Sequence, residues 1–359
     1  MVILFDRAIM GALIGKLGIT LLVVVGLYLT IDLFESMRRF ASLPGVDFAL
    51  IAMWELLKLP AMFIQIGPLA LLIAGVIGWN QLLASGELTA WRSGGTGLMR
   101  LTRPFVFMAL ALGALNVAIS DWVMPVSDPL MRNISKVKFG EPLPDDVEGD
   151  WLRMPDGTIY QLHFPPQSPV PTALTRIVFD GQTQPKELIR AQIEVLTPDG
   201  VRLSQGTRLW HTNDGWQRRD LAGQVLPLPP SVRQSMERQF NPRRFSSSAL
   251  AQMLWAGQLP ESTLIQIQKS LWERGQTLLL PVALMLLVPL LGGLNPRAGG
   301  ATWRVAAAIG AGFGLHVVEQ VARRIAESGA LHMGVAIVGP TLILGLLLGG
   351  LLRRRDARL

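Results

Sequence analysis

The sequence predicts an α-helical membrane protein with six transmembrane helices, arranged three and three around an inserted all-β domain that is jelly-roll-like. Half of the 359 residues are hydrophobic and only 16% are charged, whereas typical soluble domains have about 25% charged residues. The apolar residues are concentrated in six segments, separated in the middle by a long polar interval with strand-like alternation. Lipid must therefore solvate part of the chain, and the polar interval predicts a separate domain in water.

The first three apolar segments cover about residues 12–33, 48–83 and 104–124, and each is long enough to cross a bilayer, which takes about 20 residues. As a helix, the second would reach roughly 54 Å, well beyond a hydrocarbon core of about 30 Å. We therefore expect it to tilt, protrude or break, with Pro60 and Pro68 as the positions of a bend.

Strands are predicted in the polar interval at residues 131–265. Apolar and polar residues alternate along 158–164, 174–179 and 188–196. Glycines that follow aspartates separate the strands, and we expect each to supply the positive φ of a tight turn. These pairs are Asp156-Gly157, Asp180-Gly181, Asp199-Gly200 and Asp214-Gly215.

The last three apolar segments, at about 277–294, 305–321 and 333–352, follow a polar helical stretch at 246–271. The predicted organisation is a first membrane part at 1–130, the β domain at 131–265 and a second membrane part at 266–359.

Positive charge in the short connections predicts the orientation, because Lys and Arg gather on the cytoplasmic side. With the N-terminus inside, ten arginines lie inside and four outside, so we expect cytoplasmic termini and a β domain outside the inner membrane. The ten are Arg7, Arg92, Arg100, Arg103, Arg297, Arg304, Arg353, Arg354, Arg355 and Arg358, and the four are Arg38, Arg39, Arg323 and Arg324.

The net charge of +7 belongs to the membrane parts, because residues 131–265 hold 15 Lys and Arg against 14 Asp and Glu. No basic stripe with interleaved aromatic residues remains, so we expect no nucleic-acid partner. The chain has no cysteine, which excludes a disulfide framework and thiolate metal sites. No catalytic, metal or cofactor motif is present: Gly11 to Leu17 is too short for a phosphate loop, and His316-x-x-Glu319 is more typical of an interior hydrogen bond.

Ionisable residues at helix ends are the candidate functional groups, because charge at membrane depth is costly. Arg38 and Arg39 end the first span, and Glu35 is spaced to pair with both. The remaining candidates at the same predicted level are Arg132, Lys136, Arg323 and Arg324. These cations would suit a ligand with phosphates, and the alternative is snorkelling to the lipid interface without a ligand.

Two further polar features occur in and after the second span. Glu55 and Lys58 either pair with each other or lie beyond the lipid. A short helical segment near 82–95 lies on the predicted cytoplasmic side, with Leu88 and Trp91 on one face. It either docks in a groove of a partner protein or forms an interfacial turn.

Several stretches resemble the LptF/LptG (YjgP/YjgQ) permeases of the lipopolysaccharide export transporter, and the likeness covers essentially the whole chain. Ser85 to Gly94 resembles the family's coupling helix, and Asp121-Trp122-Val123-Met124-Pro125 running into Met131-Arg132-Asn133 resembles the end of its third span. Leu33 to Arg39 is similar to LptG-type subunits, with Asp32 as a departure, whereas Asn295-Pro296-Arg297 is similar to LptF-type chains. The overall likeness is closer to LptG.

The resemblance implies a non-enzymatic subunit that pairs with a second LptF/LptG-type chain and with an LptB ATPase dimer, which hydrolyses ATP with Mg²⁺. It implies that Glu87, Leu88, Trp91 and Arg92 couple this chain to the ATPase. Lipopolysaccharide phosphates would meet Arg38, Arg39, Arg132, Lys136, Arg323 and Arg324. The lipid would then pass to the periplasmic bridge through LptC and LptA.

Two rival functions are consistent with parts of the pattern. One is a membrane-anchored assembly scaffold whose β domain binds a partner protein, although an anchor has no need of charged clusters on separate spans. The other is a lipoprotein-releasing permease, which the arrangement of three spans on each side of the domain opposes.

Overall fold

The computed structural model divides the chain into two units, one formed by Met1–Met131 with Gln268–Leu359 and the other by Arg132–Ile267. Each unit is described by itself. The residues described are 2–41, 43, 45–135, 151–163, 171–179, 184–197, 200–212, 215–232, 240–256, 259, 261–292, 301–327 and 331–356.

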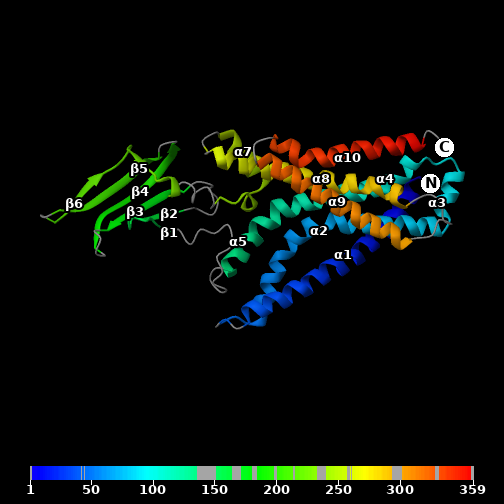
Figure 1. Cartoon of the computed structure of the whole chain (residues 1–359), viewed down its shortest axis with the longest axis horizontal. Coiled ribbons are helices and arrows are strands. Elements are labelled where there is room, and N and C mark those ends of the chain that lie inside the picture. The colour runs from blue at the N-terminus through cyan, green and yellow to red at the C-terminus, as the bar shows by residue number, and fades with distance from the viewer. Residues whose placement is uncertain are drawn as a thin grey trace. The chain divides into compact units, whose positions relative to one another are not determined.

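Six helical segments in these ranges are long and apolar enough to cross a membrane, which confirms the predicted spans. The third span is built from two α-helices joined by a π-helical turn, η1 (Figure 1). The segments are α1 (Val2–Phe40), α2 (Phe48–Ala84), α4 (Leu98–Ala118) with η1 (Ile119–Val123) and α5 (Met124–Ile134), α8 (Glu261–Gly292), α9 (Ala301–Glu327) and α10 (Met333–Asp356).

Helix α2 supplies much of the core of the helical unit. Asp47 caps its start by accepting a hydrogen bond from the Leu50 amide at 2.9 Å. The helix continues through both Pro60 and Pro68, so of the three predicted outcomes (tilt, protrusion or a break) the break does not occur. Its Trp79 is fully buried and packs against Phe105 of α4, with 5.6 Å between ring centroids.

Helices α1 and α9 are much less covered than α2. Within the chain, no residue of the most apolar window of α1 is buried, and only 11% of that of α9 is. Large side chains such as Leu22 and Phe34 on α1 and Phe313 on α9 are therefore exposed in the single chain. These apolar faces must contact lipid, another protein chain or an apolar ligand when the protein lies in a membrane.

The second unit contains an antiparallel seven-stranded sheet, as expected for an inserted all-β domain (Figure 1). Six strands follow one another as neighbours in chain order, β1 to β6, and β7 pairs with β5. The strands are β1 (Trp151–Arg153), β2 (Ile159–His163), β3 (Ala173–Phe179), β4 (Pro185–Thr197), β5 (Gly200–Thr212), β6 (Gly215–Asp220) and β7 (Val225–Pro227). One face is apolar, with Leu162, Leu174 and Leu203 buried in its core.

Turn glycines between strands are only partly as predicted. Gly157 and Gly215 have the expected positive φ, and Asp156 accepts a 2.9 Å hydrogen bond from the Thr158 amide, which lowers the pKa of Asp156. Gly200 was expected to do the same and does not: it lies in β5, where a Cβ would collide with the Leu226 carbonyl of β7. Gly181 lies outside the described residues.

A 3₁₀ turn, η3 (Pro242–Arg244), and a short helix, α7 (Ser247–Ala256), follow the sheet before α8 begins. The helical stretch expected at 246–271 is therefore present as parts of two helices, α7 and α8.

Candidate functional site

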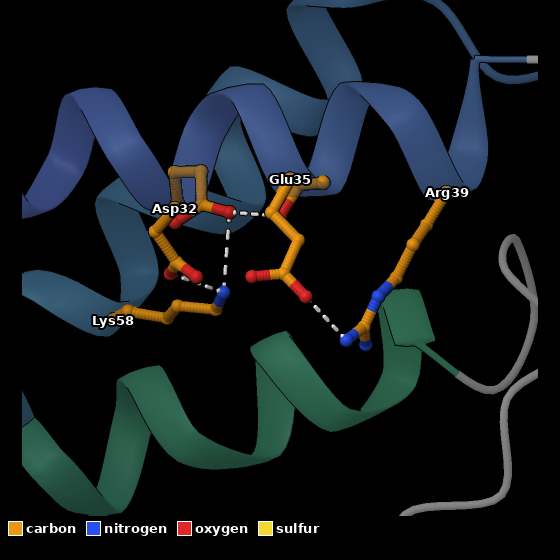
Figure 2. A network of polar contacts seen from close by, with 6 residues as sticks. Asp32, Glu35, Arg39 and Lys58 are labelled. Carbon is orange, nitrogen blue, oxygen red and sulfur yellow. Dashed lines mark hydrogen bonds and ion pairs between the residues drawn. The ribbon is translucent and has the colours of Figure 1, made fainter.

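A network of charged and polar side chains joins the end of α1 to α2 (Figure 2). The Lys58 ammonium lies 2.8 Å from Asp32 Oδ2 and 3.1 Å from Glu55 Oε1. The buried Glu55 also accepts a 2.6 Å hydrogen bond from the Ser36 hydroxyl of α1. These contacts satisfy charges that would be costly in lipid, and they fix α1 against α2.

The predicted pair of Glu55 and Lys58 therefore forms, and it recruits Asp32, the residue that departs from LptG-type chains. The Lys58 ammonium also lies over the Trp54 ring, 3.5 Å from its centroid. Phe40 packs edge-on against Trp54 at 5.7 Å. The charge of Lys58 is thus held inside the chain.

The two arginines at the end of α1 have different surroundings. Arg39 donates to Glu35 Oε1 at 2.6 Å, one turn earlier, and both side chains are about half exposed. Figure 2 shows the Arg39 guanidinium reaching back to Glu35, away from Lys58. Arg38 is exposed and has no ion pair within the described part of the chain. Arg38 is therefore the cation of this group that is available to an external anion.

The arginines of α9 are also distinct from one another. Arg323 donates to Glu273 at 3.3 Å and to Gln276 at 3.0 Å, so it joins α9 to α8. Arg324 is exposed. Arg132 lies in α5, and Lys136 lies outside the described residues. Arg39 is therefore paired within its own helix, α1, whereas Arg323 of α9 is paired with α8.

Glu319, predicted to take part in an interior hydrogen bond, is buried and accepts from the Thr341 hydroxyl of α10 at 2.8 Å. His316 is exposed beside Gln320, 3.4 Å away. Glu319 therefore bonds to α10 and not to His316, the partner that the spacing had suggested. Among the described residues, no group of His, Asp and Glu could hold a metal ion.

A further ion pair between helices, which the sequence did not predict, joins α8 to η1. Arg274 of α8 lies 2.5 Å from Asp121 of η1, and its side chain is 9% exposed. The π turn occurs at this point, where the Met124 amide donates to the Ile119 carbonyl instead of one residue later. The helices are close here, because a Cβ on Gly113 would lie 2.9 Å from the Leu278 backbone.

The short helix predicted near 82–95 is present as α3 (Glu87–Ser93) (Figure 1). Leu82 to Ala84 still belong to α2, and the chain turns at Gly86, whose φ of 77° favours glycine. Glu87 is exposed and accepts from the Ser85 hydroxyl at 3.1 Å. Because Glu87 lies in the first turn of α3, the positive end of the helix dipole stabilises its carboxylate.

The other α3 residues that were singled out have different exposures. Leu88 is 1% exposed and Trp91 is partly buried, and both pack into the core of the helical unit. Arg92 is partly buried. Leu88 and Trp91 therefore attach α3 to its own chain, and Glu87 is the most outward of the four residues.

Six spans around an inserted β domain define a multi-pass membrane protein. The chain belongs to the family described as lipopolysaccharide export system permease LptF/LptG, whose model matches residues 7–354. The family is a permease component of an export system and not a catalytic enzyme.

Curated relatives agree with this family. The chain is 24% identical over 156 residues to the lipopolysaccharide export system permease protein LptG of Escherichia coli K12, and equally to that of strain O6:H1. Each match covers 43% of this chain and 43% of the relative. With its six apolar helices and this family membership, the chain is an integral inner-membrane protein.

Proposed function

We propose that this chain is a permease subunit of an ATP-driven lipopolysaccharide exporter. It extracts lipopolysaccharide from the outer leaflet of the inner membrane and passes it to a periplasmic bridge of LptC and LptA type. Its partners are a second LptF/LptG-type permease, with which it encloses the lipid path, and an LptB-type ATPase dimer, which binds ATP and Mg²⁺. The family match over residues 7–354 is the main support.

The surface of α1 carries the proposal for the substrate. Leu27, Ile31 and Phe34 are exposed along this helix, and the exposed Arg38 follows one turn later. An apolar face that ends at a guanidinium is complementary to a lipid whose acyl chains lie beside phosphates. The apolar side chains would contact the acyl chains, and Arg binds phosphate through bidentate hydrogen bonds. Arg324, an exposed residue at the end of α9, is proposed as a further phosphate contact together with Arg132 and Lys136.

The orientation follows from the charge bias in the sequence. Figure 1 shows both ends of the chain and α3 at the same end of the helical unit. With this end in the cytoplasm, the arginines of the last turn of α10 lie inside, as the distribution of Lys and Arg favours. Arg38 and the β domain then lie on the periplasmic side.

Coupling to the ATPase is assigned to α3. The exposed Glu87 would enter a groove of the ATPase, while Leu88 and Trp91 transmit its movement to the core into which they pack. Arg92, which is partly buried in the last turn of α3, is assigned to the same contact.

Purification of the tagged chain from a native membrane in mild detergent tests the proposal directly. We expect an ATPase dimer and a second six-span chain to be recovered with it, because the transporter is a stable assembly. Mass spectrometry and stoichiometry measure this. Recovery of a β-domain partner without any ATPase would instead support the membrane-anchored scaffold and contradict the transporter.

Charge reversal at α1 tests the substrate contact. Arg38→Glu with Arg39→Glu should reduce photo-crosslinking of lipopolysaccharide to the outer part of α1 by about tenfold or more, since each charged contact contributes about 1 kcal/mol or more. Assembly with the ATPase should be unchanged. A matched control is Arg218→Glu with Arg219→Glu, an exposed pair on β6. Crosslinking equal to wild type would show that the α1 arginines only reach the lipid interface.

A further inference from the structure

Helix α4 is capped at its start by a residue from the far end of the chain. Its N-cap residue, Gly97, has no side chain, so it leaves the first amides of α4 without a local acceptor. The carboxylate of Asp356, the last residue of α10, accepts from the Leu98 amide at 2.5 Å and approaches the Met99 amide at 3.5 Å. One carboxylate therefore links two helices through residues that are 258 positions apart in the sequence.

The fit at this contact requires glycine. A Cβ on Gly97 would lie 2.7 Å from Asp356 Oδ2, and the backbone of Gly97 has φ −65° and ψ 155°, which any residue adopts. Serine or aspartate is the usual cap at such a position. The glycine is thus explained by the space that the Asp356 carboxylate occupies and not by backbone conformation.

Asp356 is unfavourable for its own helix. It follows Arg353, Arg354 and Arg355 in the last turn of α10, where the helix dipole favours cations over carboxylates. The start of α4 has the opposite polarity and favours an anion. The charge of Asp356 is therefore stabilised by the start of α4 and not by its own helix.

Helix α3 is connected to this same contact between α4 and α10. The α3 helix ends at Ser93, and the Thr96 amide folds back to the Trp91 carbonyl at 3.1 Å immediately before Gly97. Leu88 of α3, Leu98 of α4 and Leu352 of α10 are all buried in one cluster. The carboxylate and this cluster hold α3, the start of α4 and the end of α10 as one body.

We propose that Asp356 is a positioning residue for energy coupling, which clamps the end of the last span to the start of α4 so that displacement of α3 moves both helices. The proposal rests on the proposed function, in which α3 receives the ATPase. Loss of the clamp lets α3 follow the ATPase without moving α10. ATP hydrolysis then continues with less lipid transported.

The test uses the complete transporter in proteoliposomes. Asp356→Ala should lower the lipopolysaccharide transported per ATP hydrolysed by about fivefold, the factor by which losing one hydrogen-bonded contact between α10 and α4 shifts an equilibrium. The ATPase should still be recovered with the chain in normal stoichiometry. Arg354→Ala, an exposed neighbour, is the matched control and should leave the ratio unchanged.

A second variant separates the clamp from simple helix capping. Asp356→Ala combined with Gly97→Ser gives α4 a local cap without a link to α10. The ratio should stay low in this double variant, and spin labels at Ser93→Cys and Arg355→Cys should show a broader distance distribution than in the chain with Asp356. The labels are specific because the chain has no cysteine of its own.

Two results would overturn the clamp alone: an unchanged ratio in Asp356→Ala, or full recovery of the ratio by Gly97→Ser. Absence of transport in the wild-type complex would instead overturn the proposed function, and the clamp with it. Measuring transport by the wild-type complex first therefore separates failure of the proposed function from failure of the clamp.

Discussion

Replacing Arg274 with leucine is expected to lower the free energy of unfolding of the helical unit by about 3–5 kcal/mol, the usual cost of removing one partner from a buried ion pair. The Arg274 side chain is 9% exposed, and its guanidinium lies 2.5 Å from Asp121. Without it, the Asp121 carboxylate faces an apolar side chain in the middle of a helix contact. Thermal unfolding in detergent, followed by tryptophan fluorescence, measures the loss.

Two further variants identify the cause of that loss. Arg274→Leu with Asp121→Leu should recover most of the stability, because replacing both partners of a buried pair with apolar residues is close to neutral. Arg39→Leu removes a pair that is about half exposed and should cost only about 0.5 kcal/mol. An Arg274→Leu chain as stable as the Arg39→Leu chain would show that the pair does not hold α8 against η1.

The spans could be predicted from the sequence because hydropathy depends only on composition along the chain. Their ends could not. The third span was expected at 104–124, whereas helical structure runs from Leu98 to Ile134 through a π turn. Hydropathy detects only the part of a helix that lies in lipid. The helix itself continues beyond that part wherever the backbone groups of its end find hydrogen-bond partners, as the Leu98 amide does with the Asp356 carboxylate.

The candidate site was predictable where pairing follows helix periodicity. Glu35 with Arg39 and Glu55 with Lys58 are spaced one turn apart, and both pairs form. Asp32 with Lys58 could not be predicted, because contact between two helices depends on their relative rotation and depth. No spacing in a single segment encodes either quantity.

The sequence also could not predict which residues of α3 are buried in the chain's own core. Leu88 and Trp91 share a face, which predicts an apolar contact but not with which chain. The structure places Leu88 against the chain's own core, so the residue that faces outward is Glu87. This division of roles sharpens the test of coupling.

Glu87→Ala is expected to abolish lipopolysaccharide transport and to release the ATPase. Truncating one partner of a buried charged contact in an interface costs about 2 kcal/mol or more, which weakens binding by at least about 30-fold. Co-purification and transport in proteoliposomes measure the two effects. A variant with normal export and normal complex formation would refute the assignment of α3 as the coupling helix.

The controls for Glu87 follow from its local contacts. Ser85→Ala removes the 3.1 Å hydrogen bond to Glu87 but keeps its charge, and should leave ATPase binding within about twofold, because an exposed neutral hydrogen bond contributes little. Glu87→Gln keeps an acceptor for Ser85 but loses the charge, and should resemble Glu87→Ala. If Ser85→Ala were the more damaging change, the carboxylate would act by shaping the turn at Gly86, and the ATPase contact would have to come from another face of α3.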